Sequence, residues 1–315
     1  MSNNFGIPYL GSKNKIADWV IDQLPSATHF YDLFCGGCAV THCALLHRKY
    51  HEYFINDIIP VMPKLFIDAV TGRFRHENRW ISREDFFRLK DKDGYARVCF
   101  SFGSDGRSYA YARELEPFKK AFHNALFFND YSDFARLGVK ITTPHELNGS
   151  HAKYMALKRR MTGMGLNGVL HVTTKRFDLQ SFEKLLRLQS FESLDHFRSL
   201  GRLSTFSSLK YLHACSGDYQ KVEILPDSVI YCDIPYKGTK QYGPSSSAFD
   251  YSRFYDWALS QKEPVFISEY SMPSDFECIA EIPKNCSLSA TNNACQTVER
   301  LFVPKGQKYM TNRLF

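Results

Sequence analysis

Residues 29–39, with the sequence HFYDLFCGGCA, decide the fold that this chain predicts. The stretch begins as an apolar, aromatic-rich strand, reaches two adjacent glycines and continues with helical character to residue 46. The next predicted strand, residues 53–56, ends at Asp57. Because a strand–helix–strand order builds a right-handed crossover between parallel strands, it predicts an α/β sheet.

The same α/β character returns near the end of the chain, so both ends are expected to build one sheet. We expect one domain from residues 1–70 and 221–315, interrupted by an insert at 71–220. The predicted strands are 29–34, 53–56, 229–232, 264–268 and 299–304, and the predicted helices of this domain are 16–24, 39–46, 65–70 and 254–259.

The insert differs from its frame in charge. Residues 71–220 hold 25 Lys and Arg against 16 Asp and Glu, whereas the rest of the chain holds 15 against 17. Predicted helices lie at 82–89, introduced by a Ser82–Asp85 capping pattern, and at 115–128. A basic insert in a near-neutral frame indicates a polyanionic partner such as nucleic acid. The alternative is a solvated surface with a chance excess of positive charge.

Positive charge is most concentrated within residues 151–176, where basic side chains are interspersed with glycines. As a cluster these side chains are candidates for phosphate contacts, although any single one is better explained as a solvated surface residue. The candidates are Lys153, Lys158, Arg159, Arg160, Lys175 and Arg176. Residues 185–209 form a low-complexity repeat with an apolar residue at every third position. This period fits neither a helix nor a strand, so we expect a spacer.

Residues 228–236, SVIYCDIPY, place a carboxylate, a stiff turn and an aromatic ring at the end of a short apolar strand. This trio suits a flat ring that bears an amino group, because Asp233 can accept from the amine while the face of Tyr236 stacks on the ring. The alternative is an ordinary strand that ends in a proline turn.

The two glycines and Asp57 together have the form of a nucleotide site. Gly36 and Gly37 let a ligand approach the backbone beside the N–H groups at the start of a helix. Asp57 follows about 20 residues later, where an acidic residue meets ribose hydroxyls in nucleotide-binding units. The full G-x-G-x-x-G pattern is not present, so a tight turn alone also accounts for the glycines.

Three segments in this order resemble the Dam-type (alpha-class) DNA adenine-N6 methyltransferases: residues 8–13 (PYLGSK), 32–39 (DLFCGGCA) and 233–236 (DIPY). The resemblance covers roughly residues 1–65 and 225–315, and over the middle of the chain it rests on position and charge only. It implies a Rossmann-like methyltransferase sheet with an inserted, mainly helical target-recognition domain. It also implies S-adenosylmethionine as methyl donor and a flipped adenine of double-stranded DNA as acceptor.

The resemblance further implies the roles of individual residues. Tyr9 and Lys13 would hold the methionine end of the donor, Lys13 as a point charge for its carboxylate, and Asp57 would accept from the ribose hydroxyls. The implied donor-binding set is Tyr9, Gly11, Lys13, Asp32, Phe34, Gly36, Gly37 and Asp57, and the implied catalytic set is Asp233, Ile234, Pro235 and Tyr236.

Two positions depart from the family pattern. Cys38 stands where the family often has a second glycine, which puts the backbone path of the loop in question. Ile234 replaces a proline, which we expect to be tolerated because the reaction uses the backbone carbonyl at that position and not the ring.

The implied chemistry needs no metal, because the sulfonium is a good leaving group and the transfer is direct. Cys35, Cys38, His42 and Cys43 have metal-like spacing. A zinc ion inside the glycine loop would obstruct the donor, so we expect none.

Composition sets the remaining expectations. Nine cysteines without a repeating frame favour free thiols in a reducing, cytoplasmic setting, and no apolar segment is long enough for a membrane span. We expect a monomer that does not bind membranes. Transfer to N4 of cytosine, transfer to RNA, a catalytically idle DNA-binding relative and a nucleotide-dependent oxidoreductase are the alternatives. The residues decide neither the recognition sequence nor whether a restriction endonuclease accompanies the protein.

Overall fold

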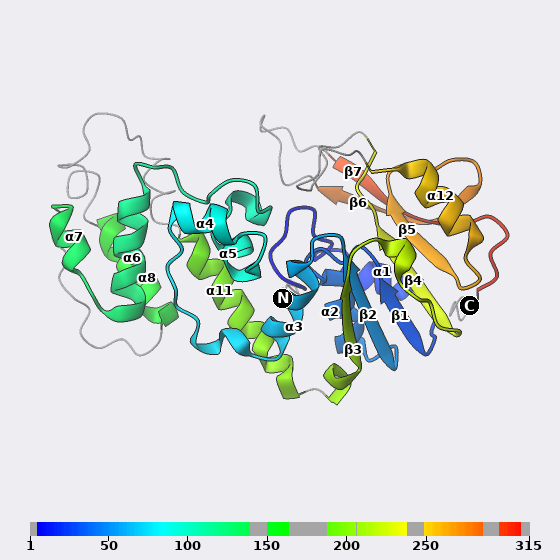
Figure 1. Ribbon diagram of the computed structural model, residues 1–315, viewed down its shortest axis with the longest axis horizontal. Helices are drawn as coiled ribbons and strands as arrows, with labels where there is room; N and C mark the ends of the chain where they lie inside the picture. The colour runs from blue at the N-terminus through cyan, green and yellow to red at the C-terminus, as the bar shows by residue number, and fades with distance from the viewer. Residues whose placement is uncertain are drawn as a thin grey trace. The chain divides into compact units, whose positions relative to one another are not determined.

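The computed structural model describes residues 5–138, 150–163, 188–205, 207–237, 249–285 and 296–309. Within it the chain divides into two compact units, one formed by Met1–Thr71 with Arg202–Phe315 and the other by Gly72–Gly201 (Figure 1). Each unit is a separate body with its own core, so each is described by itself.

The first unit is built on one seven-stranded sheet (Figure 1). From edge to edge its strands are β3 (Leu212–Ser216), β2 (Glu52–Asp57), β1 (His29–Asp32), β4 (Ser228–Asp233), β5 (Val265–Glu269), β7 (Gln296–Pro304) and β6 (Phe276–Asn285). The first five run parallel, and β7 is antiparallel to both of its neighbours. The predicted fold class, a mostly parallel α/β sheet of the Rossmann-like methyltransferase kind, is therefore confirmed.

The strand order reverses between β1 and β4, because β1 leads on to β2 on one side while β4 leads on to β5 on the other. In open α/β sheets, ligands bind beyond the carboxyl ends of the strands at such a switch point. The polar residues that end β1, β2 and β4 are therefore placed where a ligand site is expected.

Helices cover both faces of this sheet. On one face, Tyr31 and Ile230 pack in a buried cluster with Phe254 of α12 (Tyr251–Ser260). On the other face, Phe30 stacks on Tyr50 near α2 (Ala39–His47), and the remaining helices of the unit are α1 (Ala17–Gln23) and α3 (Val61–Val70). All four helices were predicted. The structure starts α3 four residues earlier, because Pro63 lies in the first turn, where its missing N–H costs nothing.

Two strands were not predicted. β3 is an edge strand whose side chains are mostly exposed, so it lacks the apolar alternation that identifies a strand. It lies within residues 71–220, the range assigned to the insert, yet residues 202–220 belong to the first unit. β6 is the opposite edge strand and contains Pro283, which a sequence pattern counts against a strand.

In its described residues the regular secondary structure of the second unit is helical, apart from one isolated bridge between Ser101 and Tyr109. Ser82 caps the first of its α-helices as predicted, with its Oγ accepting from the Asp85 N–H at 3.1 Å. The helices are α4 (Arg83–Leu89), α5 (Gly94–Cys99), α6 (Glu116–Phe128), α7 (Ser132–Arg136), α8 (Ser150–Gly163) and α11 (Gln189–Leu200). None of the helices in the described parts of either unit has the length and apolar content of a membrane span.

The three-residue repeat is part of the core of this unit, so its interpretation as a spacer is wrong for the described residues 188–203. Leu188, Phe191, Leu194, Phe197, Leu200 and Leu203 are all buried, most of them in α11. A step of three residues turns an α-helix by 60° less than a full circle, so the stripe winds around the helix. Such a pattern suits a helix that is covered on most of its sides, and Glu192 and Ser199 are its exposed positions.

Candidate active site

A cavity of about 200 Å³ opens at the switch point of the first unit. It lies where β1, β2 and β4 end, and their last residues, Asp32, Asp57 and Asp233, all line it. Every residue implied by the family resemblance for the donor and for the base lines this cavity: Tyr9, Gly11, Lys13, Asp32, Phe34, Gly36, Gly37, Asp57, Asp233, Ile234, Pro235 and Tyr236. Three segments that are distant in sequence therefore meet at one place.

Strand register explains why the acidic side chains converge. β1 and β4 are parallel neighbours in which Asp32 lies opposite Tyr231. Paired positions share a face and side chains alternate, so Asp233, two residues after Tyr231, points to the same side as Asp32. This is the face opposite the α12 cluster, to which Ile230 and Cys232 contribute.

The glycine loop is held tightly by the N-terminal segment. The Ile7 N–H donates to the Gly37 carbonyl oxygen at 2.7 Å. A Cβ atom on Gly37 would lie 2.5 Å from the Ile7 oxygen, and Gly36 adopts a φ of +46°. The two glycines are therefore required, one by close backbone approach and the other by a left-handed conformation.

The conformation of Cys38 shows the backbone path of the glycine loop at the position where the family often has a second glycine. Cys38 adopts φ 55° and ψ 34° at the start of α2 and is fully buried. The loop thus keeps a left-handed turn at this position without glycine, at a conformational cost of about 1–2 kcal/mol. Burial raises the pKa of both Cys35 and Cys38 above the ordinary thiol value, so both thiols stay protonated.

The Asp57 side chain holds the glycine loop in place by accepting hydrogen bonds from backbone N–H groups. Its Oδ2 accepts from the Gly36 N–H at 2.8 Å, and its Oδ1 accepts from the Ile59 N–H at 2.8 Å. The carboxylate is only 7% exposed, and it lines the cavity between these two contacts.

Asp32 is a strongly perturbed carboxyl of the cavity. Burial, assisted by the neighbouring charges of Asp233 and Asp57, raises the pKa of Asp32 to about 7. The Thr41 hydroxyl donates to its Oδ2 at 2.6 Å, whereas its buried Oδ1 has no hydrogen-bond partner among the described residues. This oxygen is therefore a candidate acceptor for a ligand.

Lys13 joins the N-terminal segment to the catalytic motif. Its Nζ lies 2.6 Å from Asp233 Oδ1, 3.7 Å from Glu299 Oε1 and 4.6 Å from the centroid of the Tyr236 ring. Burial lowers the pKa of Lys13, but the charges of Asp233 and Glu299 outweigh burial and raise it above the ordinary value. Lys13 is therefore a charged group that is bound to the carboxylate assigned to the base.

Ile234 supports the motif through its side chain as well as its backbone. It is 1% exposed and packs in the cluster with Leu33 and Phe254, on the α12 side of the sheet. The next carbonyl, that of Pro235, accepts from the Tyr251 hydroxyl at 2.8 Å. The turn is thus held by packing and by a hydrogen bond, which compensates for the missing proline.

Two residues outside the implied donor and catalytic sets also contact the site. Tyr270 lines the cavity, and its ring makes an edge-to-face contact with the Tyr236 ring, with 4.5 Å between the ring centroids. Glu299 was missed as a site residue, although its strand was predicted. It shares the buried face of β7 with Leu301 and Val303, and a lone charge in such an inward-facing row was the available signal.

The second unit carries the predicted basic cluster only in part within the described residues. On α8, Lys153 and Lys158 flank the buried stripe of Tyr154 and Leu157, while Arg159 is exposed. Arg160 lies in the same helix. Lys175 and Arg176 lie outside the described residues.

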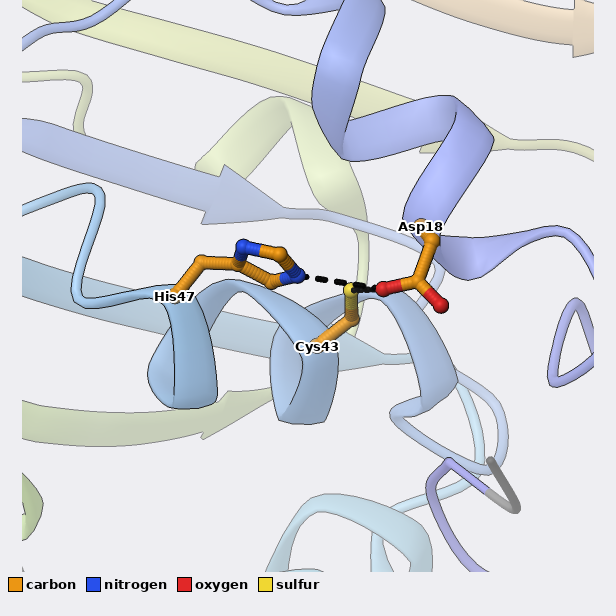
Figure 2. Close-up of side chains that lie close together, drawn as sticks. All are labelled: Asp18, Cys43 and His47. Carbon is orange, nitrogen blue, oxygen red and sulfur yellow. Dashed lines mark hydrogen bonds and ion pairs between the residues drawn. The ribbon is translucent and has the colours of Figure 1, made fainter. Parts of the chain in front are cut away.

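A further group of polar side chains lies away from the cavity, between α1 and α2 (Figure 2). Asp18 Oδ1 accepts from the Cys43 thiol at 3.2 Å and lies 3.0 Å from His47 Nε2. Burial and the hydrogen bond to Asp18 raise the pKa of the Cys43 thiol above its ordinary value. Each donor thus already has a partner at one carboxylate oxygen, and the group ties the two helices together.

Cys35 and Cys38 form a side-chain hydrogen bond with each other, but His42 and Cys43 do not join them in one cluster among the described residues. Cys43 is directed to Asp18, whereas the neighbouring His42 uses its Nδ1 to accept from the Gly6 N–H at 2.9 Å. The sequence pattern in the glycine loop is therefore explained by separate structural contacts.

Comparison with known families agrees with this geometry. Residues 9–147 match the D12 class N6 adenine-specific DNA methyltransferase family. The match begins at Tyr9 and includes Lys13, the glycine loop and Asp57, and it confirms the predicted resemblance to DNA adenine methyltransferases.

A similar relative carries a related description. The type II methyltransferase M.CviAII of Paramecium bursaria Chlorella virus 1 is 40% identical over 57 residues, which is 16% of this chain and 17% of the relative. The chain thus aligns with about a sixth of the length of that protein. The D12 match ends before Asp233, so the assignment of the catalytic turn rests on the geometry of the cavity.

Proposed function

We propose that this protein is an S-adenosylmethionine-dependent DNA methyltransferase that transfers a methyl group to N6 of a flipped adenine in duplex DNA. The observation that carries the proposal is the convergence of residues 9–13, the glycine loop, Asp57 and residues 233–236 around one cavity. The D12 class match over residues 9–147 supports adenine as the target base.

The charge of the cavity suits the proposed donor. Three carboxyl groups, those of Asp32, Asp57 and Asp233, line it, and Lys13 is the sole Lys or Arg among the residues that form its described wall. An excess of carboxyl groups in a desolvated site favours a cationic ligand such as a sulfonium. Lys13, which also lines the cavity, supplies a point charge for the donor carboxylate.

The proposed reaction is a direct displacement. The N6 lone pair of adenine attacks the methyl carbon, the carbon–sulfur bond breaks with its electrons going to sulfur, and the methylated amine then releases one proton to water. The Asp233 carboxylate and the Ile234 carbonyl hold the two amine hydrogens and orient the lone pair. Tyr236 stacks on the extruded base. S-adenosylmethionine supplies the methyl group, and these residues supply position and electrostatics.

The helical unit is the proposed DNA-binding part of the protein. Phosphate contacts from the α8 cluster would provide sequence-independent affinity, and the excess of positive charge over residues 71–220 supports this role. Transfer to N4 of cytosine presents the same amine geometry and is the second candidate. A cytoplasmic location fits the free thiols of the described cysteines, and a monomeric state remains part of the proposal.

The test is incubation of the purified protein with labelled S-adenosylmethionine and unmodified duplex DNA. We expect label in the DNA, and modification-aware sequencing of DNA from an expressing host should locate N6-methyladenine at one recurrent sequence. N4-methylcytosine would select the second candidate. Donor binding without any incorporation would overturn the proposed activity and favour an idle DNA-binding relative.

A further inference from the structure

Glu299 carries a charge in a place where an isolated charge is costly. It is fully buried in β7, and the β5–β7 register places it on the same side of the sheet as Ser268, the partner of Asp233. A buried carboxylate persists only when hydrogen bonds or opposite charges compensate for its lost hydration. The groups that contact the Glu299 carboxylate therefore indicate its role.

The first contact is with the aromatic ring of the catalytic turn. The Tyr236 hydroxyl donates a hydrogen bond to Glu299 Oε1. Burial and the nearby charges of Asp233 and Glu299 raise the pKa of Tyr236, so the hydroxyl keeps the proton that it donates. This bond fixes the far end of the ring, while the edge contact with Tyr270 limits its rotation.

The second contact is with the only cation that touches this group in the described structure. Lys13 Nζ lies between Asp233 Oδ1 at 2.6 Å and Glu299 Oε1 at 3.7 Å, and its side chain is 5% exposed. A single ammonium thus bridges two carboxylates from β4 and β7. Without Glu299, Asp233 would be the one carboxylate of the two left to balance the charge of the buried Lys13 ammonium.

We propose that Glu299 is a positioning residue for the methyl transfer. It holds the Tyr236 ring at the angle needed to stack on the base, and it shares Lys13 so that Asp233 remains available to the base amine. Glu299 acts through these two residues and takes no part in bond making. The inference rests on the proposed function, because the stacked base and the amine belong to that reaction.

The test compares Glu299→Ala and Glu299→Gln with Tyr236→Phe in the full chain. Glu299→Ala removes both contacts and should lower kcat about 100-fold while changing KM for S-adenosylmethionine less than threefold, because misplacing a reacting group affects the transition state most. Glu299→Gln keeps an oxygen for the Tyr236 hydroxyl and should recover about 10-fold of that loss. If Glu299→Ala does not fold, Glu299→Gln carries the test.

Two further measurements separate positioning from a structural role. Tyr236→Phe lacks the same hydroxyl, so adding it to Glu299→Ala should cost little more, whereas independent roles would multiply the losses. The fluorescence of 2-aminopurine at the target adenine should change in Glu299→Ala, because the ring no longer stacks in one orientation. Glu281→Gln on the neighbouring strand, where Glu281 is exposed and paired with Arg300, is the matched control and should behave as wild type.

The outcomes are distinct. An active wild type whose Glu299→Ala variant keeps kcat within twofold would overturn this inference and leave the proposed function intact. Multiplying losses in the double variant would also overturn it. A wild type that transfers no methyl group to DNA would overturn the proposed function, and the inference would fall with it.

Discussion

The two units of this protein use charge in opposite ways. In the sheet unit the charged groups at and beside the cavity are buried and held by hydrogen bonds or ion pairs, as Asp32, Lys13 and Glu299 illustrate. In the helical unit, Lys153 and Lys158 of α8 are half-buried and Arg159 is exposed, beside the buried Tyr154 and Leu157. Chemistry on a base requires desolvated charges at fixed positions, whereas attraction of a polyanion works through solvated charges. The difference predicts which substitutions affect transfer and which affect binding.

The largest expected effect comes from the buried charge of the sheet unit. Asp233→Ala removes the carboxylate that is proposed to accept from the amine, so we expect kcat to fall by at least about 10³-fold. DNA affinity should change less than threefold, because the proposed phosphate contacts lie in the other unit. Transfer is measured with labelled donor and DNA affinity by fluorescence anisotropy.

Asp233→Asn serves as the matched variant, because it keeps the volume beside Lys13 and removes only the charge. Because its amide oxygen can still accept from the amine, it should lose less activity than Asp233→Ala, and circular dichroism checks that both variants fold. Substantial transfer by Asp233→Ala, which has no side-chain acceptor, would show that Asp233 is not the acceptor.

Much of the sheet unit was predictable, because its signals are local. The apolar strands, the two glycines and the acidic strand ends all lie within short segments, and side-chain alternation then places Asp32 and Asp233 on one face. Glu299 escaped prediction because its partners, Lys13 and Tyr236, come from distant segments. The edge strands β3 and β6 escaped because exposed strands lack an apolar pattern.

The helical unit was less predictable for a physical reason. Its core depends on α11, where the three-residue repeat is buried although it matches no single helix face. Only the other helices around it explain why so much of its circumference is apolar. The basic cluster could be located by composition, but composition does not say which cations contact phosphate.

The second prediction tests that cluster. Replacing Lys153, Lys158 and Arg159 together by Ala should weaken DNA binding on the order of 100-fold at about 0.1 M salt, since each phosphate contact releases condensed counterions. The slope of log affinity against log salt should fall by about one for every phosphate that is no longer neutralised, and kcat at saturating DNA should stay within threefold. Binding is measured by anisotropy across a salt series.

Arg136→Ala is the control for this cluster, because Arg136 is exposed in the same unit and already paired with Asp133 at 2.8 Å. It should leave the salt slope unchanged. An unchanged slope in the triple variant as well would move the DNA-binding surface away from the described part of α8.

The third prediction concerns the pH dependence of donor binding. The pKa of Asp32 is raised to about 7 in the donor-free protein, so the carboxyl is mostly protonated at pH 6 and mostly ionised at pH 8. A cationic donor favours the ionised form, and affinity should rise up to about 10-fold between these pH values. Isothermal titration calorimetry with S-adenosylmethionine measures the change.

Asp32→Asn should bind the donor more weakly and lose this pH dependence. The contribution of Asp32 to folding stability changes with pH in the opposite direction from its contribution to donor binding. Because the folded-state pKa of Asp32 is raised, the stability that it contributes is present at acid pH and is lost as the pH rises through about 7. The wild type should therefore lose stability relative to Asp32→Asn between pH 6 and pH 8, and equal denaturation curves at both pH values would contradict the assigned shift.

The smallest expected effect lies at the polar group between α1 and α2, which has the residue types of a metal site but the contacts of a hydrogen-bonded tie (Figure 2). His47→Ala removes one partner of Asp18, and both side chains are about half exposed, so the free energy of unfolding should fall by less than about 1 kcal/mol. Prolonged treatment with a chelator should change neither the melting temperature nor methyl transfer. The group would instead be a metal centre if a chelator abolished methyl transfer and zinc restored it in the wild type but not in His47→Ala. The sheet unit would then hold a bound metal ion as well as its buried charged side chains.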